Sequence, residues 1–194
     1  MKNQLKDILL TDGEKVKTWR TATVHMFGYG KLKGRQVKID LKDKGTYKAD
    51  TFHVYRKLIK ENAKKLLHFV LYCRMDEQGQ IIKLRIREAH LSEIQETYAA
   101  FHVIQRVSGK QSPSGTNVIK IHGNPDGDLW KPYYWQVDTE EISALKPRDG
   151  VNMLGVVEDG ILIAKEALVL KEMPPRKQHY EGLKVQQPSK KVAA

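Results

Sequence analysis

One strand pattern occurs twice in this chain, first as Leu67-His-Phe-Val-Leu-Tyr72 followed by Gly79-Gln-Ile-Ile-Lys-Leu84. About 80 positions later it returns as Gly150-Val-Asn-Met-Leu-Gly-Val-Val157 followed by Gly160-Ile-Leu-Ile-Ala-Lys165. In both places an apolar strand leads through a turn that ends in glycine to a second apolar strand, which is typical of a β-hairpin. The repetition predicts a chain of two similar halves.

The elements before the first hairpin follow from changes in hydrophobic period. Residues 35–42 alternate strictly, with Val37, Ile39 and Leu41 on one face, and therefore form a half-buried strand. Residues 51–55 read as a further strand, with Phe52 and Val54 facing inward. The complete prediction for this half is strands at 19–27, 35–42, 51–55, 67–74 and 81–88, a glycine-rich loop at 28–34, and a short helix at 56–65.

The second half gives the same order of elements. A helix is predicted between the third and fourth strands, because Asp138 followed by Glu141 is typical of a helix start and the apolar pattern ends at Leu145 before a proline. The strands are predicted at 101–107, 117–122, 130–135, 151–157 and 161–170.

Five strands with a helix between the third and fourth are the element order of the oligonucleotide/oligosaccharide-binding (OB) fold. Over about residues 15–170 the chain resembles tandem OB-fold proteins, the group that includes replication protein A and bacterial single-stranded DNA-binding proteins. The resemblance implies an all-β protein with short helices, built as two tandem five-stranded OB-like Greek-key barrels. We expect a basic barrel at 1–95, an acidic barrel at 96–172 and a mobile basic tail at 173–194, with the boundary between barrels near 92–97.

The positive charge is concentrated in the first 75 residues. They contain 18 Lys/Arg against 7 Asp/Glu, an excess equal to the net charge of +11 of the whole chain. Residues 76–170 carry 10 against 14, and residues 171–194 carry 6 against 2. Clustered cations favour a polyanionic ligand such as nucleic acid. A solvated surface is the alternative interpretation.

Composition excludes several other classes of protein. No apolar run approaches the ~20 residues of a membrane span, and Lys6 and Asp7 interrupt the start before a signal peptide develops. The single cysteine, Cys73, excludes an internal disulfide and is expected to be a buried thiol. We therefore expect a cytoplasmic protein that does not bind membranes.

Catalytic and cofactor motifs are also missing. The seven histidines show no metal-ligand spacing, and the calcium-like segment that begins at Asn124 has Trp135 where a glutamate is required. No dinucleotide or phosphate-loop motif follows Gly28-Tyr-Gly30. The sequence therefore predicts a protein without a cofactor and without enzymatic activity.

The OB resemblance implies a ligand across the second and third strands, bounded by the loops beside them. On these strands and the first loop, the candidates are basic or aromatic, because Lys/Arg follow a phosphate backbone and aromatic rings stack on bases. They are Tyr29, Lys31, Lys33, Arg35, Lys38, Lys42, His53 and Tyr55. The alternative is that Tyr55 packs at the barrel edge and the lysines only promote solubility.

Further candidates lie on the fifth strand and in the second half. Lys83, Arg85 and Arg87 alternate with Ile82, Leu84 and Ile86, so they either bind an anion or protect a solvated edge strand. In the second half the candidates are Lys120, Trp130 and Tyr134.

The sequence therefore predicts a non-catalytic protein that binds single-stranded DNA or RNA through a basic groove and aromatic stacking. The alternative is an interaction subunit of a nucleoprotein complex, whose acidic second half binds a protein partner.

Overall fold

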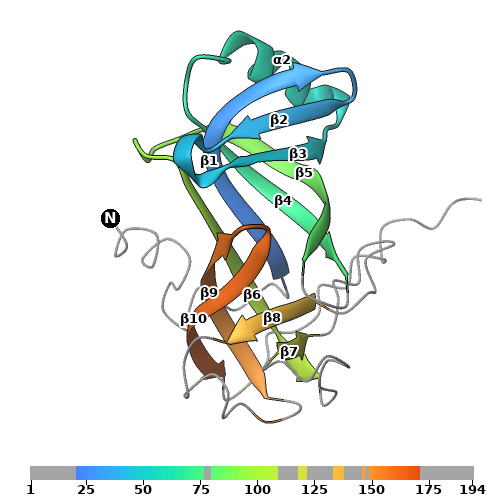
Figure 1. Ribbon diagram of the computed structural model, residues 1–194, viewed down its shortest axis with the longest axis vertical. Coiled ribbons are helices and arrows are strands. Elements are labelled where there is room, and N and C mark those ends of the chain that lie inside the picture. The colour runs from blue at the N-terminus through green and yellow to red at the C-terminus, as the bar shows by residue number, and fades with distance from the viewer. Residues whose placement is uncertain are drawn as a thin grey trace, which may run out of the picture.

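The computed structural model describes residues 21–76, 80–108, 118–121, 133–137, 146 and 149–170 (Figure 1). The first half contains β1 (Thr21–Lys33), β2 (Gln36–Asp40), the 3-10 helix η2 (Lys42–Lys44), β3 (Thr46–Asp50), α2 (His53–Glu61), β4 (Leu67–Met75) and β5 (Ile81–Leu91). The second half contains β6 (Tyr98–Ser108), β7 (Val118–Ile121), β8 (Tyr133–Val137), β9 (Gly150–Glu158) and β10 (Ile161–Leu170). The described residues are thus mostly strand.

The first five strands close into a barrel. β1 pairs with β2 and β4, β2 pairs with β3, and β5 pairs with β4 and, in parallel, with β3. The ring β1-β2-β3-β5-β4, with α2 in the connection from β3 to β4, has the strand order of the OB fold (Figure 1). The OB-like barrel predicted for the first half is confirmed.

Alternating apolar residues fill this barrel. On β2, Val37 and Ile39 are fully buried while their neighbours are exposed, as the strict alternation predicts. Ile59 closes the core from α2. Among the described residues, the largest fully buried side chains are Phe69, Met26, Ile39, Leu41, Ile59, Leu67, Leu71 and Ile86 of the first half and Phe101 of β6.

The predicted loop at 28–34 is wrong, because β1 continues to Lys33 and only Gly34 and Arg35 form the turn to β2. β1 pairs with β4 up to Gly28 and with β2 from Tyr29 onward. A Cβ atom on Gly28 would lie 2.7 Å from Leu41 Cδ2 and 2.8 Å from the Asp40 carbonyl oxygen. Glycine therefore permits close packing where the strand passes from one partner to the other.

The predicted strand at 51–55 is also wrong, since the third strand is β3 and α2 starts at His53. The helix was predicted at 56–65, so it begins and ends a few residues earlier. Its period of 3.6 residues turns Ile59 into the core and leaves Val54 70% exposed, whereas a strand would have buried Val54. Phe52, predicted to face inward, is 44% exposed.

The strands of the second half have boundaries close to those predicted. β6 pairs with β7 and β9, β7 with β8, and β10 with β9 and, in parallel, with β8. The helix predicted from Asp138 lies outside the described residues.

The sheet does not stop at the expected boundary near 92–97. Residues Thr21–Phe27 of β1 pair antiparallel with Tyr98–Ile104 of β6, so one hydrogen-bonded sheet runs through both halves. The turn between β9 and β10 also contacts the first half, because the Gly160 carbonyl accepts a hydrogen bond from Ile81 N (2.8 Å) and the Asp159 carbonyl accepts one from Gln80 Nε2 (2.7 Å). The two halves are joined at more than one place.

Candidate nucleic-acid interface

The outer face of β1, β2 and β3 carries a row of lysines. In register, Lys31 of β1 is opposite Lys38 of β2, and Lys38 is opposite Lys48 of β3. All three are exposed, and within the described part of the chain none forms an ion pair. We call these residues the lysine row. Like charges on directly opposed strand positions repel, so an anionic ligand would stabilise this arrangement.

Most other candidates from this region surround the lysine row. Lys33, Arg35 and Lys42 are exposed, and the Lys42 ammonium lies 5.6 Å from the centre of the half-buried Tyr29 ring. Asp40 and Asp50 interrupt the positive charge on the neighbouring register positions. The basic surface is therefore strongest along the lysine row, which includes one residue, Lys48, that the sequence prediction missed because it located the third strand too late.

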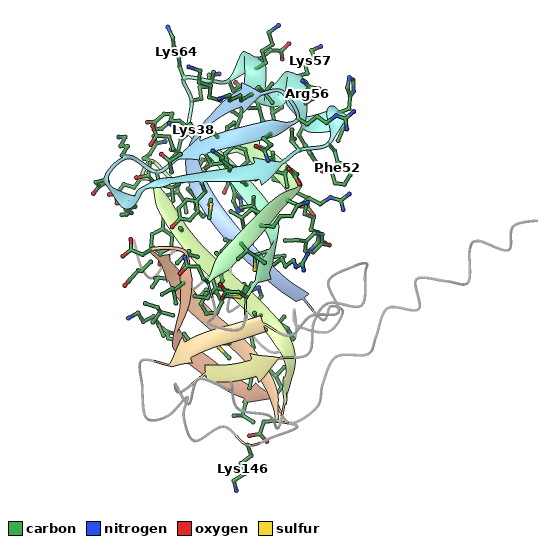
Figure 2. All side chains as sticks on the ribbon, turned by 45° about the vertical axis from the view of Figure 1, so that its right-hand side comes forward. Lys38, Phe52, Arg56, Lys57, Lys64 and Lys146 are labelled. Carbon is green, nitrogen blue, oxygen red and sulfur yellow. The ribbon has the colours of Figure 1, made fainter. Side chains whose placement is uncertain are left out.

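A hollow of about 370 Å³ opens at the end of β3. We call it the Phe52 hollow; it is lined by Arg35, Asp50, Thr51, Phe52, Lys83 and Arg85. The Arg85 guanidinium lies 4.3 Å from the centre of the Phe52 ring. Figure 2 shows Lys38 on β2 and Phe52 pointing outward beyond β3. Sequence reasoning missed Phe52 because it predicted an inward strand position.

Asp50 organises one side of the Phe52 hollow. Its carboxylate forms an ion pair with Lys83 Nζ (3.0 Å) and accepts a hydrogen bond from Gln36 Nε2 (3.2 Å). The hydrogen bond from Lys83 is the main reason why the pKa of Asp50 lies below its usual value. Lys83 is therefore already paired, while Arg35 has no ion-pair partner among the described residues.

His53 and Tyr55 do not lie on the strand face where they were predicted. His53 is exposed in the first turn of α2. Tyr55 is half-buried against the core, and its hydroxyl donates a hydrogen bond to the Arg87 carbonyl (2.7 Å). The geometry thus favours the alternative interpretation of Tyr55, in which it packs α2 against the barrel.

The cations of β5 have separate partners. Lys83 and Arg85 contribute to the Phe52 hollow, whereas Arg87 Nε forms an ion pair with Glu88 Oε1 (3.1 Å) and its guanidinium lies 5.7 Å from the Tyr72 ring centre. Because β5 pairs with both β4 and β3, the edge-strand interpretation is wrong. Ile82, which alternates with these cations in the sequence, is 54% exposed and lies next to a register shift between β4 and β5.

The second-half candidates are only partly described. Lys120 of β7 and Tyr134 of β8 are opposite each other in register. Trp130 lies outside the described residues.

Three histidines that looked scattered in the sequence meet on β1, β4 and β5. His25 Nδ1 and His68 Nε2 share a hydrogen bond of 3.0 Å, and the His68 and His90 ring centres are 6.3 Å apart. Burial lowers the pKa of His25 to about 3 and that of His68 to about 4. The register His68↔His90 across β4 and β5 could not be found without the strand pairing.

Other potential reactive groups give no site. Cys73 is buried, as predicted, and burial raises the pKa of its thiol to about 12. Among the described residues, no group of three or more His, Cys, Asp or Glu could hold a metal ion. No helix in the described ranges is long and apolar enough to cross a membrane.

No protein-family model matches the sequence, and no curated protein matches it. Solved structures that resemble the chain include two of one bacterial protein. Wild-type single-stranded DNA binding protein from Thermus aquaticus has a TM-score of 0.43 and 11% identity, covering 81% of this chain and 96% of that one. A deletion mutant of the same protein has a TM-score of 0.43 and 12% identity, covering 80% and 98%.

Proposed function

We propose that this protein binds single-stranded nucleic acid on the outer face of β1, β2 and β3, without covalent chemistry. The observation that carries the proposal is the lysine row: Lys31, Lys38 and Lys48 are opposed in register, exposed and without ion-pair partners among the described residues. Lysines placed in this way neutralise phosphates and release counterions from a nucleic acid. The OB strand order supports the proposal, because this fold commonly binds oligonucleotides across the same strands.

We also propose that the chain is a tandem of OB-like barrels, with the first at 1–95, the second at 96–172 and a basic tail at 173–194. The pairing of β6 with both β7 and β9 supports this division, because β1 pairs with β2 and β4 in the same way. The parallel pairing of β8 with β10 corresponds to that of β3 with β5. The acidic charge of the second half makes the first half the main nucleic-acid contact.

Salt-dependent binding tests the proposed function. If Lys31, Lys33, Arg35, Lys38 and Lys48 each contact a phosphate, the slope of log K against log salt for a single strand is roughly −3.5, which is about a 130-fold loss of affinity between 50 and 200 mM. Binding is measured by fluorescence anisotropy with single-stranded DNA, single-stranded RNA and duplex DNA of equal length. We expect both single strands to bind more tightly than the duplex, whose bases are not free to stack.

The triple variant Lys31→Glu, Lys33→Glu, Arg35→Glu weakens binding for every sequence and reduces the slope by about 2. These side chains are exposed, so the barrel remains folded. Lys110→Glu in the second half is the matched control and produces a smaller loss. An affinity that hardly changes with salt contradicts the electrostatic mechanism, and a loss only in the control assigns the ligand to the second half.

A further inference from the structure

The Phe52 hollow has a different composition from the lysine row. It is built by three segments that are distant in sequence: the turn after β1 (Arg35), the end of β3 with the residues that follow it (Asp50, Thr51, Phe52), and β5 (Lys83, Arg85). Its volume of about 370 Å³ is at the small end of the ~300–1,000 Å³ range of small-molecule sites. The space suits one small planar group with a short extension.

An aromatic ring and a guanidinium form a flat surface in this hollow. Phe52 is 44% exposed, and the Arg85 guanidinium covers its ring at 4.3 Å. Both groups are surfaces on which unpaired bases stack in single-stranded nucleic acids. Neither Arg85 nor Arg35 forms an ion pair in the described part of the chain, whereas Lys83 is neutralised by Asp50 at 3.0 Å. The Arg85 guanidinium thus lies on the Phe52 ring, and the Arg35 guanidinium can bind an anion.

We propose that the Phe52 hollow is a mononucleotide subsite, in which one unpaired base stacks on the Phe52 and Arg85 pair and the adjoining phosphate binds Arg35. The subsite rests on the proposed function, since the nucleotide belongs to the strand that crosses the lysine row. Lys48 precedes Asp50 by two residues on β3, so about 7 Å separates the lysine row from the margin of the hollow. One strand can therefore occupy both.

This ligand explains both properties of the hollow. A phosphate alone would not require an exposed phenylalanine, and an uncharged aromatic molecule would not require Arg35 beside it. The subsite also differs from the lysine row in what it recognises, because the row contacts only phosphates while the hollow contacts a base.

The test compares two strands that differ only in their bases. One is an oligothymidylate of about 12 nucleotides, which fits the ~4–16 nucleotides bound by an OB fold, and the other is an abasic oligomer of equal length. Both are titrated at low salt against the full chain and its variants. Phe52→Leu weakens binding of the oligothymidylate about 10-fold, as expected for one lost stacking contact, and leaves the abasic strand within about twofold.

Three further variants isolate the cause. Arg85→Lys keeps the charge but removes the planar guanidinium, so it weakens oligothymidylate binding and spares the abasic strand. Lys38→Glu weakens both strands, because it acts on phosphates. Val54→Ala removes an exposed apolar side chain, 70% exposed and close in sequence to Phe52, and changes neither strand.

The outcomes separate the two proposals. If Phe52→Leu has no effect on the oligothymidylate, or weakens both strands equally, the subsite is refuted while the lysine row stands. If the unmodified protein binds neither strand, the proposed function fails. In that case the subsite is tested by NMR with deoxythymidine 5′-monophosphate at millimolar concentration. Chemical-shift changes of the Phe52 ring resonances that are absent in Arg85→Lys support the subsite, and the absence of such changes in the unmodified protein refutes it.

Discussion

This protein buries uncharged histidines, so we expect its free energy of unfolding to decrease already in mildly acidic solution. His25 is 8% exposed, its Nε2 lies 2.9 Å from Thr23 Oγ1 and its Nδ1 lies 3.0 Å from His68 Nε2. The pKa of His25 is lowered to about 3, first by burial and then by the charges of His68, His102 and Arg87. Burial likewise lowers the pKa of His68 to about 4.

The sign of the effect follows from which state binds the proton. In the unfolded chain each histidine titrates near its ordinary pKa of 6.5, so below that pH the unfolded state binds protons that the folded state does not. Stability is therefore complete above pH 6.5 and decreases as the pH falls toward the folded pKa values. At pH 5 each of His25 and His68 has lost about 2 kcal/mol of the free energy of unfolding, or about 4 kcal/mol together. A domain of ordinary stability has only ~5–15 kcal/mol in total.

Urea denaturation followed by circular dichroism at pH 7.5, 6.0 and 5.0 measures this loss. We expect a decrease of about 4 kcal/mol between pH 7.5 and 5.0, with little change above pH 7. Asp50 does not contribute in this range, because its lowered pKa moves its effect to more acidic pH. Substitution of the exposed His53 by Asn is the control and retains the full decrease. A free energy of unfolding that is constant within 1 kcal/mol from pH 7.5 to 5.0 would refute the reasoning.

Three other predictions concern single residues. Lys48→Glu weakens single-strand binding about 10-fold at 50 mM salt, measured by fluorescence anisotropy. The control is Lys64→Glu, at an exposed lysine beyond α2 (Figure 2), and it has a smaller effect. Equal losses in the two variants would contradict the role of the lysine row. Gly28→Ala lowers the free energy of unfolding by about 1–3 kcal/mol in urea denaturation, because the added methyl group contacts the Asp40 carbonyl oxygen, and a neutral result would disprove the tight packing. Cys73 does not react with a thiol reagent in the native protein and reacts fully in denaturant, and rapid native labelling would contradict its burial.

Periodicity was sufficient to predict some elements. Val37 and Ile39 alternate with polar residues on β2, and the apolar runs from Leu67 and from Ile81 are strands with the predicted starts. These segments have one face in the core, so the buried positions repeat at the period of the backbone. The strand order was implied by the resemblance to the OB fold, which depends on the helix between the third and fourth strands.

Elsewhere the local signal was misleading. Glycines such as Gly28 indicate a loop in a sequence, but here glycine is the residue that fits between Leu41 and the backbone of β2 inside a strand. Phe52 follows β3 too closely for a pattern to show whether strand or helix comes next. Pairing between strands brings Lys48 opposite Lys38 and Arg85 opposite Asp50, and it places Lys83 at the Phe52 hollow. The alternation within each strand does not show which residues of two strands are opposite each other.

The pairing of β1 with β6 has a consequence for biosynthesis. A nascent chain that has emerged only as far as residue 95 has all five strands of the first barrel, yet the Thr21–Phe27 edge of β1 still lacks its partner. At ~5–20 residues per second, the ribosome supplies Tyr98–Ile104 within a few seconds, so the edge is open only briefly. Unpaired edges recruit other chains. A gene fragment that encodes the first half alone would keep this edge open permanently, and its product should self-associate even though the duplicated pattern makes the halves look separable.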